Sequence, residues 1–144
     1  MDTVTGGVGL RTGPGPMEPV MGSHPLRYRH WAPQWPTRPT LVLIHGLFGD
    51  MESWPSLLPE ALRLGFGVLC IELPSHGESP FEATGFDQAA ARVAETLAQA
   101  ANGPLVLVGH SMGAAIAARV ARRVDAAQLR SLLLISPAGC GPDI

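Results

Sequence analysis

The sequence predicts an α/β fold, with a mostly parallel sheet and helices on both faces of that sheet. Short, continuous apolar runs, typical of strands buried on both faces, alternate with segments of helical periodicity. Strands and helices that alternate in this order are joined by right-handed crossovers, which pack the helices against the sheet. The chain has 144 residues, of which 46% are hydrophobic and 15% charged, so it can bury the core of one domain.

Five strands are expected. The segment 25–33, which reads PLRYRHWAP, alternates in polarity between prolines and predicts the first of them. Continuous apolar runs predict further strands at 40–46, 67–73, 104–109 and 129–136. Ligands in such folds bind beyond the carboxyl ends of the strands, so the loops that follow these runs are the first places to look for a site.

Three helices are expected between these strands. In the first, residues 53–65, Ser53 is an N-cap candidate, but Pro59 favours a later start. The second, residues 84–101, carries apolar residues on one face at helical spacing. The third, residues 111–126, has mostly small residues in its first half, which allows close packing against the sheet.

Composition divides the chain into two parts and excludes several functions. Residues 1–23 are rich in Gly and Pro and predict a flexible tail, and residues 24–144 contain the predicted strands and helices of the α/β domain. No secretory signal or run of 18 apolar residues is visible, so we expect no membrane association. Only two cysteines, Cys70 and Cys140, are present, which favours a reducing, cytoplasmic location.

The charge pattern argues against nucleic acid as a partner. The net charge is -2, and the ten basic residues, all Arg, are scattered apart from a group at the end of the third helix. The sequence also lacks a cluster of metal ligands and a phosphate-binding loop in a strand–loop–helix context. We therefore expect no metal and no cofactor.

A Gly-x-Ser-x-Gly motif joins the fourth predicted strand to the third helix. Ser111 lies between Gly109 and Gly113, at the point where a buried strand turns directly into a helix. A serine nucleophile on such an elbow needs small neighbours, and the two glycines supply them. The same turn directs the backbone amide of Met112 toward the place where an oxyanion would form beside Ser111.

A second candidate element of the site follows the strand at 40–46. Gly46 permits a sharp turn, and the backbone amide of Leu47, or failing that of Phe48, is placed to complete an oxyanion hole. His45 is interpreted as a structural residue that braces this loop. His110 is a poor candidate for the general base, since its side chain should leave the elbow away from Ser111.

Three segments, HGLFGDMESW, LPSHGES and VGHSMGAAIAARVA, together resemble the α/β-hydrolase family over residues 25–144. The C-terminal LLLISPAGCGPDI is similar to the hydrolase-like domain of the acyltransferase component of acetoin dehydrogenase complexes. The resemblance implies that Ser111 attacks the carbonyl of a small-molecule acyl substrate such as an ester or thioester. It implies that a histidine takes the serine proton, an acid orients that histidine, and the amides of Leu47 and Met112 bind the oxyanion.

The rest of the catalytic triad is missing from the sequence. In this family the order along the chain is serine, acid, histidine, but all five histidines precede Ser111. The only acids after it are Asp125 and Asp143, and Ser136 stands where some members carry the acid. We therefore expect a fragment that is cut after the strand following the nucleophile helix. That strand would be left as an apolar edge, open to self-association or to completion by another chain.

Two alternatives stay open. The first is an acyltransferase domain of an acyl-transfer complex, which would use the same elbow with a thiol or alcohol as acceptor. The second is a non-catalytic, truncated or degenerate hydrolase-like module, which the missing histidine supports.

Overall fold

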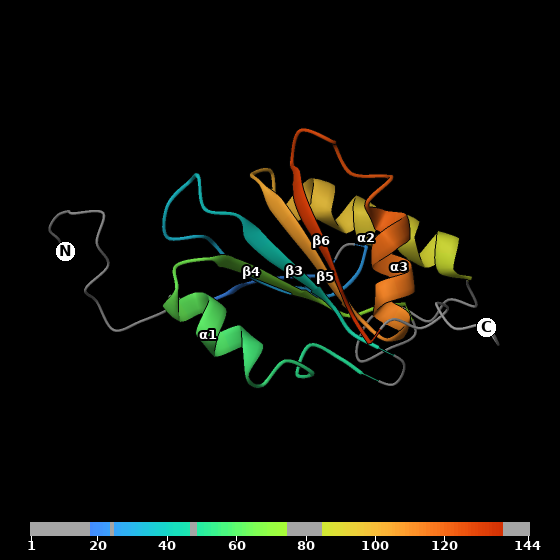
Figure 1. Cartoon of the computed structure of the whole chain (residues 1–144), viewed down its shortest axis with the longest axis horizontal. Coiled ribbons are helices and arrows are strands. Elements are labelled where there is room, and N and C mark those ends of the chain that lie inside the picture. Colours follow the sequence, from blue (N-terminus) through green and yellow to red (C-terminus); the bar gives the residue numbers. More distant parts are fainter. Residues whose placement is uncertain (1–17, 24, 47–48, 75–84, 137–144) are drawn as a thin grey trace, which may run out of the picture.

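The computed structural model describes residues 18–23, 25–46, 49–74 and 85–136, which form one sheet flanked by helices (Figure 1). Within these ranges the sheet has six strands in the order β1-β2-β4-β3-β5-β6. The strands are β1 (Val20–Gly22), β2 (Tyr28–Trp31), β3 (Thr40–Ile44), β4 (Gly67–Ile71), β5 (Leu105–His110) and β6 (Leu129–Ile135). The helices are α1 (Leu57–Arg63), α2 (Phe86–Ala100) and α3 (Met112–Val120).

The architecture confirms the predicted α/β class. Strands β4, β3, β5 and β6 pair in parallel, whereas β1 and β2 pair antiparallel. Helix α1 covers one face of the sheet, and α2 and α3 pack side by side on the other face (Figure 1). The mostly parallel sheet with helices on both faces is therefore the fold that the alternating runs predict.

The apolar runs are continuous because the central strands are covered on both faces. Side chains along a strand alternate between its two sides, so each run divides between two cores. One core, beneath α2 and α3, contains Val42 and Ile44 of β3 and Leu107 of β5. The other, beneath α1, contains Leu43 of β3 and Val108 of β5. Both cores therefore hold β3 and β5 firmly at the centre of the sheet.

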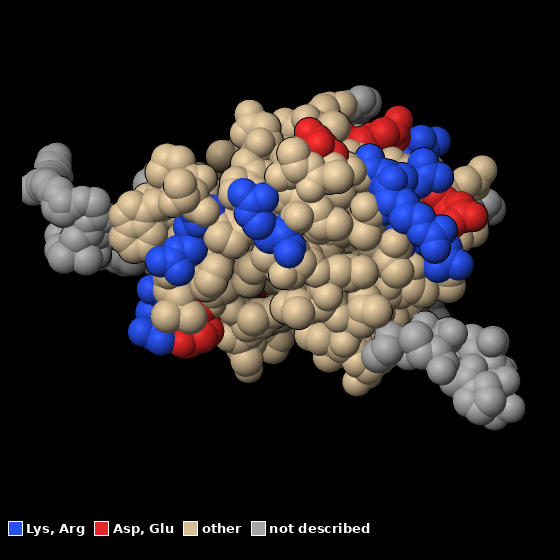
Figure 2. All heavy atoms as spheres, turned by 45° about the horizontal axis from the view of Figure 1, so that its top comes forward, with Lys and Arg blue, Asp and Glu red and all other residues tan. Residues whose placement is uncertain are grey.

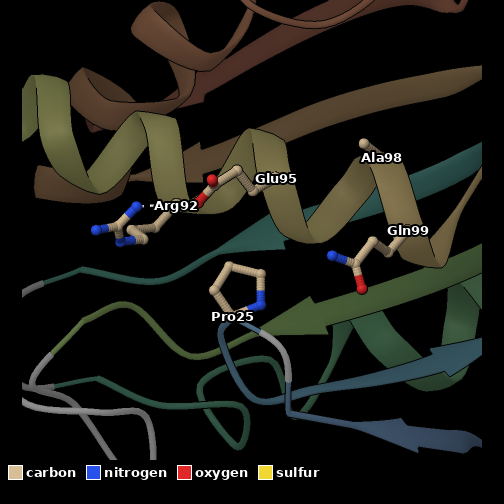
Figure 3. A pocket seen from close by; sticks show the side chains of 5 residues that line it. All are labelled: Pro25, Arg92, Glu95, Ala98 and Gln99. Carbon is tan, nitrogen blue, oxygen red and sulfur yellow. Dashed lines mark hydrogen bonds and ion pairs between the residues drawn. The ribbon is translucent and has the colours of Figure 1, made fainter.

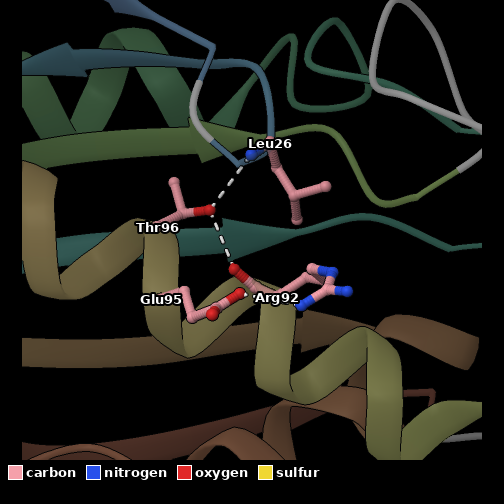
Figure 4. Close-up of polar contacts among 4 residues, drawn as sticks. All are labelled: Leu26, Arg92, Glu95 and Thr96. Atoms are coloured by element: carbon pink, nitrogen blue, oxygen red, sulfur yellow. Dashed lines mark hydrogen bonds and ion pairs between the residues drawn. The ribbon is translucent and has the colours of Figure 1, made fainter.

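A buried threonine ties α2 to the chain that enters β2 (Figure 4). The hydroxyl oxygen of Thr96, which is fully buried, accepts a hydrogen bond of 3.3 Å from the backbone N–H of Leu26. The same hydroxyl donates a 2.8 Å bond to the carbonyl oxygen of Arg92, one turn earlier in the helix. The hydroxyl is thereby satisfied inside the core, as a buried polar group requires.

The structure differs from the sequence predictions at the ends of several elements. Strand β1, Val20–Gly22, lies inside the stretch expected to be a flexible tail and pairs with β2. Helix α1 begins at Leu57, later than Ser53, as Pro59 suggested, and Ser53 instead accepts a 3.0 Å bond from the N–H of Asp50. Helix α3 ends at Val120, and residues 121–123 form turns.

Strand β6 lies at the edge of the described sheet, as expected. It pairs in parallel with β5, and none of the described residues pairs with its outer side. Three large apolar side chains of this strand, Leu133, Leu134 and Ile135, are 50%, 42% and 42% exposed. An apolar strand in this position is open to pairing with a further strand.

Candidate functional site

Ser111 lies at the sharp turn where β5 passes into α3. Its backbone has φ 58° and ψ -121°, and among the described residues it is one of two non-glycine residues with positive φ. Such a conformation is strained for an L-residue and persists only where surrounding structure holds it. Two hydrogen bonds hold it here: the Ser111 N–H donates to the Ile135 carbonyl at 3.0 Å, and its carbonyl accepts from the Ala114 N–H at 2.9 Å.

The two glycines of the motif are required by close packing of backbone against backbone. A Cβ atom added to Gly109 would lie 2.6 Å from the Cα of Ala114, in the first turn of α3. A Cβ added to Gly113 would lie 2.8 Å from the carbonyl carbon of Ile44, at the end of β3. Real Cβ atoms almost never approach other atoms so closely, so only glycine lets α3 start this near to the sheet.

The loop after β3 lies directly against Ser111. A Cβ placed on Gly46 would be 3.2 Å from the Cβ of Ser111, so Gly46 faces the serine with little room for a side chain between them. The carbonyl oxygen of Gly46 accepts bonds from the Gly49 N–H at 3.0 Å and from the His45 ring at 2.8 Å. Leu47 and Phe48, the expected amide donors, lie outside the described residues.

His45 is fully buried, and both of its ring nitrogens make hydrogen bonds. The backbone N–H of Leu73, just beyond β4, donates to Nε2 at 3.0 Å. Nε2 therefore carries no proton, and the neutral ring donates from Nδ1 to the Gly46 carbonyl. His45 thus links the loops after β3 and β4, which fits the bracing role expected of it.

Within the described chain, the Ser111 hydroxyl has no hydrogen-bond partner, and no histidine is placed as its base. Both nitrogens of His45 are engaged. His30 lies on β2, separated from β5 by two strands, and burial lowers the pKa of its ring. His110 packs against Trp54, and His24 and His76 lie outside the described residues.

Of the two acids that follow Ser111 in the sequence, Asp125 lies among the described residues, and it does not reach Ser111. Asp125 precedes β6, at the opposite end of this seven-residue strand from Ile135, which bonds Ser111. Seven residues of strand span about 20 Å, so Asp125 is remote from the serine. Its carboxylate instead accepts a 3.0 Å bond from the Ala127 N–H. Ser136 follows β6 with φ 44°, and Asp143 lies outside the described residues.

Residues 41–144 match the model of the family described as "Alpha/beta hydrolase family". The chain belongs to the α/β-hydrolase family. An acetyltransferase component of the acetoin cleaving system of Pseudomonas putida is 33% identical over 96% of this chain and 37% of its own length. Mouse (Mus musculus) sn-1-specific diacylglycerol lipase ABHD11 is 36% identical over 74% of this chain and 36% of its own length.

A solved structure is also similar to this chain. The crystal structure of a membrane phospholipase A, 33% identical, superposes with a TM-score of 0.69 over 90% of this chain and 42% of that protein. The chain spans about a third of the length of these curated relatives. The resemblance to this family and to the acetoin-system acyltransferase components, predicted from the sequence motifs, is therefore confirmed.

Two surface pockets of this hydrolase domain lie away from Ser111. One, of about 420 Å³, is lined by Pro25 and by four residues of α2, namely Arg92, Glu95, Ala98 and Gln99 (Figure 3). The other, of about 380 Å³, is lined by Trp35, Thr37, Arg38 and Pro39. Neither contains a residue of the candidate site. No group of three or more His, Cys, Asp and Glu side chains in the described ranges could hold a metal ion.

The surface charges of the hydrolase domain are mixed in sign. Arginines and carboxylates lie next to one another on the face seen in Figure 2, with a wide uncharged area between the groups. Arg119 of α3 forms an exposed ion pair with Asp87 of α2 at 3.0 Å and lies over the ring of Phe86. No helix among the described residues is long and apolar enough to cross a membrane.

Trp54 lies near the candidate site but is not among the site residues predicted from the sequence. From the sequence Trp54 is interpreted as a packing residue, although its position after the Gly46 loop would also let it line a pocket. The structure buries it to 7% exposure and places its ring 6.5 Å from that of His110, with the planes at 79°. Its position one short loop after the HGLFGD segment was the available signal.

Proposed function

We propose that Ser111 is the nucleophile of a serine hydrolase that acts on esters, thioesters or related carbonyl compounds. The observation that carries this proposal is the strained backbone of Ser111, φ 58° and ψ -121°, at a strand-to-helix turn. Strain of this kind is retained at functional sites, and an elbow of this shape exposes a serine hydroxyl. Membership of a family with lipase and esterase members supports the same chemistry.

The proposed reaction has two steps. The Ser111 oxygen attacks the acyl carbonyl carbon while a histidine takes the hydroxyl proton, and the carbonyl electrons move onto its oxygen. The backbone amides of Met112 and Leu47 are the proposed donors to that oxyanion, and the N-terminal end of α3 adds a favourable dipole. Collapse expels the alcohol or thiol with the proton from the histidine. Water then hydrolyses the acyl-serine in the same way.

The histidine of the proposed triad is not supplied by residues 112–144, and the described part of that range does not supply the acid. No histidine follows Ser111 in the sequence, and Asp125 is remote from it. Because the chain spans about a third of its curated relatives, we propose that these two groups come from polypeptide outside the 144 residues.

The outer edge of β6 is the proposed surface for self-association or for completion of the sheet by another chain. The strand exposes Leu133, Leu134 and Ile135, and its end contacts Ser111 through the Ile135 carbonyl. A second chain that pairs with this edge would bring its own residues next to the nucleophile. Leu134→Arg should weaken any concentration-dependent self-association measured by analytical ultracentrifugation, and an unchanged association constant would contradict this role for β6.

An acyltransferase is the second candidate, favoured by the similarity to the Pseudomonas putida acetyltransferase component. The same acyl-serine would then be attacked by a thiol or alcohol instead of water. Product analysis with a thioester substrate and an added thiol acceptor separates the two functions. A cytoplasmic location accompanies either proposal, supported by the free, buried thiol of Cys70.

The test is covalent labelling of Ser111 in the full-length protein by a fluorophosphonate probe, together with hydrolysis of p-nitrophenyl acetate. Ser111→Ala should abolish both signals, whereas Ser131→Ala, a matched loss of a hydroxyl from exposed β6, should change neither. Labelling or turnover that survives Ser111→Ala would overturn the proposal. Absence of both signals in the wild-type protein would favour a non-catalytic module.

A further inference from the structure

We propose that Trp54 is a positioning residue of this site, which acts through His110 to set the spacing between the Gly46 loop and Ser111. The inference rests on the proposed role of Ser111 as nucleophile. It depends on the contact between the rings of Trp54 and His110, which are 56 positions apart in the sequence and belong to different parts of the fold.

Trp54 is firmly held by its surroundings. Its side chain is 7% exposed and belongs to the core beneath α1, together with Leu43 of β3 and Val108 of β5. Its carbonyl oxygen accepts a 3.2 Å bond from the N–H of Leu58, in the first turn of α1. The indole therefore cannot shift without disturbing a densely packed core.

The contact with His110 transfers this rigidity to the elbow. The ring centroids are 6.5 Å apart and the planes are inclined at 79°, the edge-to-face arrangement that aromatic rings prefer. His110 directly precedes Ser111 and is exposed, so its ring would rotate freely without a neighbour. Trp54 limits that rotation from the side of the core.

His110 in turn supports the loop that faces Ser111. A Cβ placed on Gly46 would lie 3.2 Å from the His110 carbonyl oxygen and 3.5 Å from its ring Nδ1. The same Cβ would lie 3.2 Å from the Cβ of Ser111. Gly46 therefore faces His110 and Ser111 together, and a displaced imidazole would change the gap that an acyl oxygen must enter.

The indole N–H of Trp54 shows which property of the residue matters. Nε1 is buried and has no hydrogen-bond partner among the described residues. The contribution of Trp54 is thus the shape of its ring rather than a polar bond. Phenylalanine should replace it with little loss, because that change also removes an unsatisfied donor, whereas leucine should not.

The test measures kcat and KM for p-nitrophenyl acetate in the full-length protein. Trp54→Leu should lower kcat about tenfold to a hundredfold with KM nearly unchanged, since small misplacements of reacting groups have effects of this size. Trp54→Phe should retain kcat within about threefold. Trp35→Leu is the control: Trp35 stacks on Arg38 at 5.0 Å, contributes nothing to the site and should leave kcat unchanged.

A double-mutant cycle tests whether Trp54 acts through its neighbour. His110→Ala should lower kcat by a similar factor, and the double variant Trp54→Leu/His110→Ala should be no slower than the slower single variant. Multiplicative losses would overturn the proposal, as would a loss in KM alone or equal losses in Trp54→Phe and Trp54→Leu. Thermal unfolding of each variant shows whether it is folded at the assay temperature.

The results for the Ser111 and Trp54 variants distinguish failure of this inference from failure of the proposed function. If Ser111→Ala abolishes turnover and Trp54→Leu leaves kcat unchanged, Ser111 remains the nucleophile and the role of Trp54 is wrong. If turnover survives Ser111→Ala, or if Ser111 of the wild-type protein is not labelled by the fluorophosphonate, both proposals fail.

Discussion

Replacing Ser111 with glycine should stabilise the protein relative to replacing it with alanine, although both variants lose the hydroxyl. At φ 58° and ψ -121°, an L-residue costs about 1–3 kcal/mol of strain, which glycine does not incur. Glycine also loses about 0.4–1 kcal/mol through its greater freedom in the unfolded state. The net gain of Ser111→Gly over Ser111→Ala is therefore about 0.5–2 kcal/mol.

Differential scanning calorimetry measures this difference directly. A free-energy change of 1 kcal/mol shifts the melting temperature of a domain of this size by about 4 °C, so Ser111→Gly should melt about 2–8 °C above Ser111→Ala. The matched pair is Ser131→Gly and Ser131→Ala, because Ser131 lies in β6 and has no positive φ. There glycine should be less stable than alanine by about 0.5–1 kcal/mol.

The sign of the difference in melting temperature between the glycine and alanine variants, at position 111 and at position 131, tests whether the backbone of Ser111 is strained. A Ser111→Gly variant that melts at or below the temperature of Ser111→Ala would refute the conclusion that this backbone is strained. It would also remove the main support for an elbow, whatever the catalytic assays show. Opposite signs at positions 111 and 131 would confirm that the strain belongs to the turn and is not a general effect of glycine.

Three further predictions concern the surroundings of Ser111 and the core. Gly113→Ala should lower the melting temperature by about 3–12 °C through overpacking against β3, whereas Gly103→Ala, where an added Cβ meets nothing within 4 Å, should have little effect. His45→Phe should cost about 1–3 kcal/mol in urea unfolding, because it leaves the buried N–H of Leu73 without an acceptor. Burial raises the pKa of the Cys70 thiol to about 12, from an ordinary value of 9.0. Iodoacetamide at pH 8 should therefore alkylate Cys70 only in denaturant, and the free energy of unfolding should fall as the pH rises from about 9 towards 12. Cys70→Ala should flatten that fall.

The central strands were predictable from the sequence because they are covered on both faces. In β3, β4 and β5 the apolar residues alternate between the two cores, so the strands appear as uninterrupted apolar runs. Strand β1 has no such signal. It is three residues long, lies at the sheet edge and exposes Val20 and Met21 to 63% and 49%. Strand β1 forms because it pairs with β2, and no pattern within its own three residues predicts that pairing.

The helix ends were less predictable than the strands, since capping depends on where the neighbouring loop runs. Ser53 has the composition of an N-cap, yet its hydroxyl closes a turn with the Asp50 N–H. Helix α1 then begins at Leu57, behind Ser56, which makes no side-chain capping bond. The Ser53 hydroxyl could bond either to an N–H of a helix that starts behind it or to the N–H of Asp50, and the path of the loop determines which bond forms.

The candidate site was predictable in part. Gly109, Ser111 and Gly113 are adjacent in sequence, so the elbow is a local pattern. The approach of Gly46 to Ser111 is not local: it requires β3 and β5 to be neighbours in parallel register, with Ile44 opposite Gly109. The contact between Trp54 and His110 also requires the loop before α1 to lie over the end of β5, and no spacing in the sequence encodes that arrangement.

The strand order explains why these pieces meet at one place. From β3 the chain crosses over one face through α1 to β4, then returns across the other face through α2 to β5, on the opposite side of β3. The connections diverge at the carboxyl ends of β3 and β5, which is where open α/β sheets bind ligands. Ser111 and Gly46 lie at this point of divergence. The loop that precedes α1 brings Trp54 to it from one face, while α3 brings the Met112 amide from the other. A substitution on the face covered by α1 should therefore affect Ser111 through His110. A substitution on the face covered by α2 and α3 should affect it through the first turn of α3.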